Sequence, residues 1–296
     1  MRVLLTGGSG QLGREVLKRA PSSMDLVAPP REVLDLSDAS AVEAYARDLA
    51  PTHILHAAGW TAVDAAESQE EAARAVNAGS TAALAKVARQ LGAAMLYVST
   101  DFVFGEEHDQ PIDPDYPTDP LSVYGLTKFE GECELQERLG EQCIIVRTSW
   151  VYASHGRNFV RTMLQLMNER PELRIVADQF GSPTWAGNLA EVCLDLLQAR
   201  AWGTWHMSDA GVTSWHGFAT AIYEQGRALG LIENEVTLKA IGSADYPTPA
   251  VRPSYSALDS SATWERLGRA PMPWRQALYQ VMLELKAATP SQQDLT

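Results

Sequence analysis

The feature that most constrains the fold is a glycine-rich segment near the start of the chain, Thr6–Gly13, which reads TGGSGQLG. It follows an apolar run, Arg2–Thr6, typical of a buried strand, and it precedes residues with the apolar spacing of a helix. Gly7, Gly10 and Gly13 have the spacing G-x-x-G-x-x-G, which lets the backbone approach a pyrophosphate at the amino end of a helix. The segment therefore predicts a dinucleotide site, with a plain glycine-rich turn as the alternative.

Short strands alternate with helices through the first half of the chain. Further strands are predicted at Asp25–Ala28, His53–Ala57, Ala94–Val98 and Cys143–Val146. Helices are predicted at Gln11–Ala20, Ala39–Leu49 and Ser68–Leu91, with another beginning near Val123. This alternation indicates right-handed βαβ units and a parallel sheet, whose ligands bind at the carboxyl ends of the strands. We expect an α/β fold: a Rossmann-type doubly wound parallel sheet with a smaller C-terminal substrate-binding lobe.

The regular alternation of predicted strands and helices ends at Trp150. After it, longer irregular segments join the predicted helices Asn158–Met167, Leu189–Leu197 and Ser214–Ala228. We expect residues 1–150 to form the dinucleotide-binding Rossmann domain. Residues 151–287 are expected to form mainly the substrate-binding lobe, with some segments returning to the Rossmann domain. Residues 288–296 are polar and are expected to form a flexible tail.

The net charge and the pattern of apolar residues limit the classes of binding partner and the cellular compartment that we expect. A net charge of −13 disfavours nucleic acid and anionic membranes. The chain lacks an apolar run of the roughly 20 residues that span a bilayer, and early glycines interrupt any signal peptide. Cys133, Cys143 and Cys193 have no metal-like spacing and fit free thiols in a reducing compartment. We expect a cytoplasmic protein with no nucleic-acid or membrane partner.

A second set of residues carries chemistry. Thr100 stands in a Ser-Thr-Asp run at the end of the fourth predicted strand, and Tyr124 and Lys128 form a Y-x-x-x-K pair that opens a helix. Four residues make about one helical turn, so the phenol and the ammonium share a face. An ammonium lowers a neighbouring phenol's pKa from its ordinary value of about 10. We predict that Tyr124 is the proton donor, that Lys128 is its partner and holds the nicotinamide ribose, and that Thr100 orients a substrate carbonyl.

The residues expected near the adenosine ribose do not decide between NADPH and NADH. Sites that prefer NAD usually end the second strand with an acid. Here the chain reads Ala28-Pro29-Pro30-Arg31, and a guanidinium at Arg31 could pair with a 2′-phosphate or could be a solvated charge. Asp35 and Leu36 are placed beside the adenine. We expect NADPH, with NADH as the alternative.

These motifs resemble the extended short-chain dehydrogenase/reductases, and within them the dTDP-4-dehydrorhamnose reductases. The resemblance covers nearly the whole chain. Besides the glycine turn, Ser-Thr-Asp and Y-x-x-x-K, it includes residues 57–64 (AAGWTAVD), 147–152 (RTSWVY), 156–159 (GRNF), 178–184 (DQFGSPT) and 249–253 (PAVRP). Trp60 departs from the smaller residue usual in the family, and both a substrate-facing role and a buried anchor stay open for it.

The resemblance implies reduction of the C4 ketone of dTDP-4-dehydro-L-rhamnose to dTDP-L-rhamnose, with a dTDP-sugar as substrate. It assigns Gln11 and Leu12, with the glycines, to the pyrophosphate. The nicotinamide half would be lined by Ala57, Ala58, Gly59 and Thr61. The sugar end would be met by Thr100, Asp101 and Trp150. The residues Asn158, Gln179 and Arg252 would reach the nucleotide-sugar, Arg252 neutralising a diphosphate; for Asn158 and Gln179 ordinary loop hydrogen bonding is an equal alternative.

The sequence does not decide whether the protein binds a metal ion or forms a dimer. The six histidines are scattered without ligand spacing, so no catalytic metal is expected. Some relatives bind magnesium across a dimer contact, and Glu15 matches a residue implicated there. A solvated acid in the first helix is the favoured interpretation of Glu15. Magnesium and a homodimer are left as open possibilities.

Three other functions share parts of this framework. A sugar 4,6-dehydratase needs an Asp-Glu pair after the threonine, whereas Phe102 follows Asp101 here. A related nucleotide-sugar epimerase would show no net consumption of cofactor. A non-catalytic regulatory subunit, such as that of methionine adenosyltransferase, would keep the fold without turnover. Retention of Thr100, Tyr124 and Lys128 favours a reductase over the last of these.

Overall fold

A six-stranded, fully parallel sheet forms the centre of the protein in the computed structural model, which describes residues 1–105 and 108–288. Its strand order is β10-β5-β4-β3-β1-β2. The strands are β1 (Arg2–Thr6), β2 (Asp25–Val27), β3 (His53–His56), β4 (Ala94–Thr100), β5 (Cys143–Thr148) and β10 (Gly203–Met207). The predicted Rossmann-type α/β fold is confirmed.

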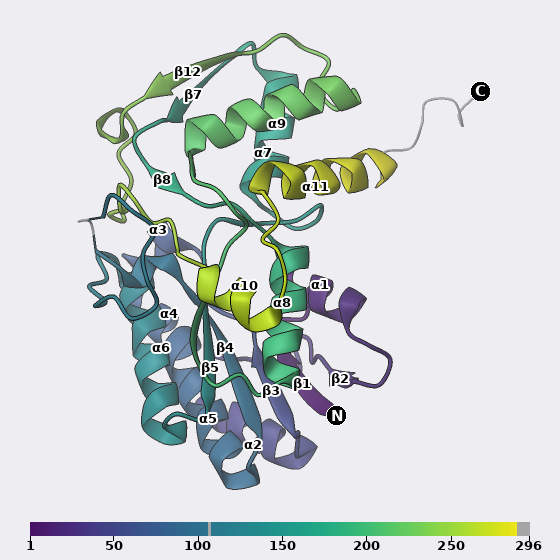
Figure 1. Cartoon of the computed structure of the whole chain (residues 1–296). Coiled ribbons are helices and arrows are strands. Elements are labelled where there is room, and N and C mark those ends of the chain that lie inside the picture. The colour runs from purple at the N-terminus through teal and green to yellow at the C-terminus, as the bar shows by residue number, and fades with distance from the viewer. Residues whose placement is uncertain (106–107, 289–296) are drawn as a thin grey trace.

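Helices cover both faces of this sheet (Figure 1). One face packs against α1 (Gln11–Arg19), α8 (Ala186–Gln198) and α10 (Ser261–Leu267). The other packs against α2 (Ala39–Leu49), α5 (Ser80–Leu91) and α6 (Val123–Leu139). Because both faces are covered, β3 and β5 are buried at every residue rather than at alternate residues.

The order of the strands fixes where a ligand can bind. The chain moves from β1 outward to β2 and then returns to place β3 on the other side of β1. Connections that leave two neighbouring strands in opposite directions open a crevice at their carboxyl ends. In this protein, the residues that follow β1 and β3 are Gly7–Gly13 and Ala57–Thr61. The topology therefore brings two of the predicted cofactor segments together.

A second body of structure lies above the carboxyl ends of the strands (Figure 1). Its core joins aromatic and aliphatic side chains of three helices and a parallel strand pair. These elements are α7 (Phe159–Glu169), β7 (Glu172–Val176), α9 (Trp215–Leu229), β12 (Thr237–Ile241) and α11 (Trp274–Ala288). Two short strand pairs complete it: β6 (Val151–Tyr152) with β9 (Thr184–Trp185), and β8 (Phe180–Gly181) with β11 (Thr213–Ser214).

The chain after Trp150 contributes to both bodies. Helix α8 packs against α1, and β10 extends the central sheet in parallel register with β5. The division at residue 150 stays a prediction. Ala288 ends α11, and the remainder of the predicted tail, residues 289–296, lies outside the described residues. Throughout the described residues, no helix is long and apolar enough to cross a membrane.

The helix predicted over Ser68–Leu91 is present over residues 70–91, but it contains one π-helical turn that was not predicted. It consists of α4 (Glu70–Arg74), a π-helical turn η1 (Ala75–Gly79) and α5, preceded by the short helix α3 (Val63–Ala66). The side chain of Asn77, inside the π turn, leaves the helix to bind the loop after β3. Single π turns of this kind often occur beside functional sites.

Candidate active site

The glycine-rich turn leaves almost no room for side chains. Gly7 has a φ of +77°, and a Cβ atom there would lie 2.8 Å from the backbone nitrogen of Ala58. A Cβ at Gly13 would lie 2.1 Å from the carbonyl oxygen of Gly7. The amino end of α1 has no side-chain cap, so its first N–H groups are available to an anion. This steric cradle fits the pyrophosphate of a dinucleotide.

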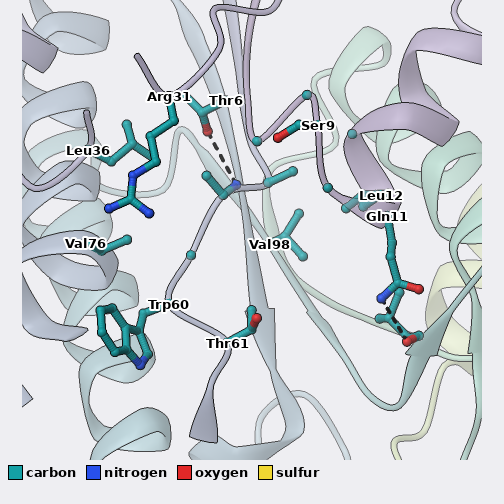
Figure 2. A pocket seen from close by; sticks show the side chains of 18 of the residues that line it. Thr6, Ser9, Gln11, Leu12, Arg31, Leu36, Trp60, Thr61, Val76 and Val98 are labelled. Atoms are coloured by element: carbon teal, nitrogen blue, oxygen red, sulfur yellow. Dashed lines mark hydrogen bonds between the residues drawn. The ribbon is translucent and has the colours of Figure 1, made fainter. Parts of the chain in front are cut away.

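A pocket runs along the carboxyl edge of the sheet from this turn (Figure 2). Its lining includes every residue predicted to bind the cofactor: Gly7, Gly10, Gln11, Leu12, Gly13, Arg31, Asp35, Leu36, Ala57, Ala58, Gly59, Thr61, Tyr124 and Lys128. The buried hydroxyls of Ser99 and Thr148 also lie in the lining, and they have no hydrogen-bond partner within the described part of the chain. Buried polar atoms without partners are expected where a ligand binds.

Arg31 reaches into one end of this pocket. Figure 2 shows its side chain running past Leu36 toward Val76. No ion pair or hydrogen bond of its guanidinium occurs among residues 1–105 and 108–288. Asp35 is used locally, since its Oδ1 accepts from the Ser37 amide at 3.0 Å and from the Ser37 hydroxyl at 2.8 Å. These bonds hold the pKa of Asp35 below its ordinary value. The free charge at this end is therefore positive.

Asn77 fixes the loop that follows β3, and sequence reasoning missed it. Its Oδ1 accepts from the backbone N–H of Trp60 at 2.7 Å, and its Nδ2 donates to the Thr127 hydroxyl at 2.9 Å. A Cβ at Gly59 would lie 3.1 Å from the Asn77 amide oxygen and 3.6 Å from Nζ of Lys128. The fully buried asparagine thus holds the loop against the helix that carries Lys128.

A neutral histidine supports the same loop from below. Nδ1 of His56 lies 2.6 Å from the Thr6 hydroxyl, and Nε2 lies 3.0 Å from the Ser80 hydroxyl. Burial, reinforced by the charge of Lys128, lowers the pKa of His56 to about 3. A neutral imidazole can donate at one nitrogen and accept at the other, which suits two hydroxyl partners.

Helix α6 brings Tyr124 and Lys128 to the mouth of the pocket. The Ser122 hydroxyl caps the helix by accepting from the Gly125 amide at 3.2 Å, and the Glu67 carboxylate accepts from the Val123 amide at 2.9 Å. A Cβ at Gly125 would lie 2.1 Å from the Phe102 carbonyl, so this glycine permits close approach to the end of β4. Tyr124 consequently packs edge-on against the Phe102 ring.

The ionisation of Tyr124 differs from the sequence-based expectation. We predicted that Lys128 lowers the pKa of the phenol. In this structure burial raises the pKa of Tyr124 to about 12, against a smaller opposing effect of a hydrogen bond with Thr100. The reason is that the ammonium is directed elsewhere, since Nζ of Lys128 donates to the Val98 carbonyl at 2.7 Å. The phenol is therefore protonated at neutral pH.

Lys128 is buried, and no carboxylate of residues 1–105 or 108–288 forms an ion pair with it. Nζ lies 3.9 Å from the centre of the Tyr97 ring, a cation–π contact. Burial lowers the pKa of Lys128 to about 7, and the charge of Glu132 opposes that shift only in part. A lysine placed in this way gains from any ligand that offers it hydroxyl acceptors.

Asp101 lies beside Thr100 at the end of β4. Its Oδ1 accepts a hydrogen bond from the Thr100 hydroxyl at 3.0 Å. Its Oδ2 is buried and has no hydrogen-bond partner within the described residues. Burial raises the pKa of Asp101 to about 6, and hydrogen bonds with the hydroxyls of Ser256 and Thr100 oppose the rise. Thr100, Asp101 and Tyr124 thus form one polar cluster at the mouth.

The residues predicted for the sugar end are not all brought together. Trp150 has a φ of +45° and stacks on Trp215 in the second body, with ring centres 3.5 Å apart. Gln179 donates to the Ser243 hydroxyl at 3.0 Å. The lining of the cofactor pocket includes none of the six residues predicted to bind the substrate, which are Thr100, Asp101, Trp150, Asn158, Gln179 and Arg252. Their contribution to a substrate site stays a prediction.

Asn158 joins the second body to the glycine turn. It caps α7 by accepting from the Arg161 amide at 3.1 Å, and its Nδ2 donates to Oε1 of Gln11 at 2.9 Å. Gln11 also donates to the Val151 carbonyl at 3.4 Å. The local bonding considered for Asn158 is present, and it fixes a side chain of the cofactor pocket.

Glu15 is buried rather than solvated, contrary to the favoured expectation. Its carboxylate pairs with Arg19 and accepts from Nε2 of His155 at 2.8 Å. Lys18 pairs with Glu284 nearby, at 2.9 Å. Among residues 1–105 and 108–288, no group of three or more His, Cys, Asp or Glu side chains could hold a metal ion.

Comparison with known proteins identifies the family. Residues 1–287 match the family described as the RmlD substrate binding domain. This chain belongs to that family. It is 38% identical to dTDP-4-dehydrorhamnose reductase of Burkholderia thailandensis over 94% of this chain and 97% of the relative. It is 37% identical to the enzyme of the same name from Escherichia coli K12, over 98% and 99% of the two chains.

Solved structures of the family have the same fold. A dTDP-4-dehydrorhamnose reductase from Clostridium acetobutylicum superposes with a TM-score of 0.90, at 33% identity over 97% of this chain and 100% of the other. One from Bacillus anthracis, solved in complex with NADP, has a TM-score of 0.89 at 32% identity over 96% and 99%. A UDP-glucose 4-epimerase from Thermus thermophilus, at 20% identity and a TM-score of 0.81, shares the fold alone.

Proposed function

We propose that this chain reduces the C4 ketone of dTDP-4-dehydro-L-rhamnose to dTDP-L-rhamnose with NADPH. The observation that carries the proposal is the placement of Tyr124 and Lys128 in a pocket built on a glycine cradle, with Thr100 hydrogen-bonded to Tyr124. Membership of a family whose relatives are named dTDP-4-dehydrorhamnose reductase supplies the substrate.

Several residues of this chain would hold the dinucleotide. The helix amino end at Gly10–Leu12 would bind the pyrophosphate, and Arg31 would pair with the 2′-phosphate of NADPH. Lys128 would bind the nicotinamide ribose in place of part of its contact with Val98. The bound cofactor supplies a reduced nicotinamide, the hydride source for a ketone.

The proton comes from the chain itself. Because the pKa of Tyr124 is raised to about 12, its phenol stays protonated at neutral pH and can donate to the substrate oxygen as negative charge develops there. The Thr100 hydroxyl, which donates to Asp101 in this structure, would orient that oxygen by turning its proton from Asp101 to the substrate. Once Lys128 is released from the Val98 carbonyl, its ammonium would be free to stabilise the phenolate that remains.

The arrangement favours a reductase over a dehydratase. A dehydratase requires an acid and a base on the residues after the threonine, and Phe102 offers neither. Asp101 accepts a hydrogen bond from Thr100, which suits a role in orientation.

The experiment that tests the proposal mixes the protein with NADPH and a panel of nucleotide 4-keto sugars. We expect loss of absorbance at the reduced-nicotinamide band with dTDP-4-dehydro-L-rhamnose, and dTDP-L-rhamnose as the product. Product formed without net loss of NADPH would indicate an epimerase. Binding of NADPH with no turnover of any sugar would indicate a regulatory protein.

A further inference from the structure

Arg252 is held by a carboxylate from a distant part of the chain. Its Nη1 donates to Oδ1 of Asp64 at 3.0 Å, and its Nη2 donates to Oδ2 at 2.8 Å. The bonds from Arg252 keep the pKa of Asp64 below its ordinary value. The two residues are 188 positions apart, so the pair joins α3 to the segment 246–256, here called the strap.

The strap crosses from the second body to the sheet. It descends past α3 toward α10 in Figure 1. Its backbone pairs with β8, where the Phe180 amide donates to the Ser254 carbonyl at 2.8 Å. Farther along, a hydrogen bond with the Ser256 hydroxyl opposes the rise in the pKa of Asp101. The strap therefore reaches from Asp64, which closely follows the pocket residue Thr61, to the polar cluster beside Thr100.

The hydrogen bonds of Arg252 leave one edge of the guanidinium unused. Besides Asp64, Nη1 donates to the Thr248 hydroxyl and to the Ala250 carbonyl. Among the residues that the structure describes, Nη2 has a single acceptor and Nε has none. The Nε–Nη2 edge is a two-donor fork of the shape that binds a phosphate through two oxygens. The side chain is 24% exposed, so a ligand can reach it.

Asp64 is well placed to fix this edge. It belongs to α3, and Glu67, directly after α3, accepts from the Val123 amide at the start of the helix that carries Tyr124. The same short segment thus touches the strap and the amino end of α6. An arginine held on one edge loses little additional freedom when the other edge binds an anion.

We propose that Asp64 is a positioning residue: it holds Arg252 so that the free Nε–Nη2 edge binds the diphosphate of the nucleotide-sugar. The inference rests on the proposed function for the identity of the substrate and on the family resemblance for the contact of Arg252 with the diphosphate; its new element is the role of Asp64. It assigns no chemical step to Asp64.

The direct test measures binding of thymidine diphosphate to the NADP⁺-saturated protein by calorimetry. We expect Asp64→Asn to weaken binding ~10-fold and Arg252→Gln to weaken it by at least as much, in keeping with a lost charge-assisted bond. The double variant should bind no more weakly than Arg252→Gln, because Asp64 acts through Arg252. Glu172→Gln is the matched control, since Glu172 pairs with Lys239 at 2.7 Å between β7 and β12.

Kinetics separate positioning from a general structural role. At saturating NADPH, Asp64→Asn should raise KM for the sugar substrate while kcat and KM for NADPH stay within about twofold. Asp64→Glu should restore part of the loss. Unchanged thymidine diphosphate binding in Asp64→Asn, or additive losses in the double variant, would overturn the inference. Because the binding test needs no turnover, it remains decisive even if the wild-type protein reduces none of the sugars.

Discussion

The glycine turn and the Tyr124–Lys128 region solve different physical problems within one pocket. At the turn, function depends on the absence of side chains, because a Cβ at Gly13 would overlap the carbonyl oxygen of Gly7. At the mouth, function depends on polar groups whose pKa values are shifted by burial. The first region should therefore fail through loss of binding, and the second through loss of chemistry with binding retained.

The largest effect is expected at the turn. Gly13→Ala places a methyl group 2.1 Å from the Gly7 carbonyl, so the turn must open and NADPH binding should fall below detection. Fluorescence titration of NADPH measures this loss. Gly79→Ala is the control, because its nearest atom would be 3.8 Å away. Normal NADPH affinity in Gly13→Ala would contradict the steric account.

Replacement of the buried lysine should give the next largest effect. Lys128→Met keeps the length of the side chain but removes the ammonium that would hold the ribose and stabilise the phenolate. We expect kcat to fall ~10²–10³-fold, the range typical of proton-transfer residues. Steady-state kinetics at saturating NADPH would measure it, and a fall below tenfold would remove Lys128 from the chemistry.

The same substitution should change the pH dependence of stability. Between pH 7 and 10.5 the unfolded chain keeps a proton on Lys128 that the folded chain has released, so the contribution of this lysine to stability rises with pH. Lys128→Met removes that dependence. Its gain in stability over the wild type should be largest at and below about pH 7 and should shrink toward pH 10.5. Urea unfolding at pH 6.5 and pH 9.5 would test the sign.

The smallest effect is expected at Arg31, which is exposed. Arg31→Ala should raise KM for NADPH ~10-fold through the lost bond to the 2′-phosphate, while KM for NADH stays within about twofold. NADH in the same variant is the internal control. Equal changes for both cofactors would assign Arg31 to the solvated surface.

Local patterns were enough to predict the cofactor half. The turn, the ends of β4 and the start of α6 each carry their signal within a few residues, and the topology then assembles them. The π turn at Asn77 could not be predicted, because its alanine-rich surroundings read as one continuous helix. The bond from Asn77 to Trp60 that explains the turn spans 17 positions.

Contacts between distant segments account for the other differences. β10 joins the sheet beside β5 although its sequence, GTWHM, lacks the apolar character of the other strands. The ion pairs between Arg252 and Asp64 and between His155 and Glu15 join distant segments of the chain, so they form only when the second body packs against the first. The high pKa of Tyr124 likewise follows from burial, which the spacing of Tyr124 and Lys128 does not contain.

The central claim is that the Tyr124 phenol donates the proton while other groups hold the cofactor. The most direct measurement compares NADPH affinity and kcat in Tyr124→Phe, which removes only the hydroxyl. We predict an NADPH Kd within about twofold of the wild type and a kcat lower by ~10³-fold. An unchanged kcat would contradict the claim and require another proton donor at the mouth.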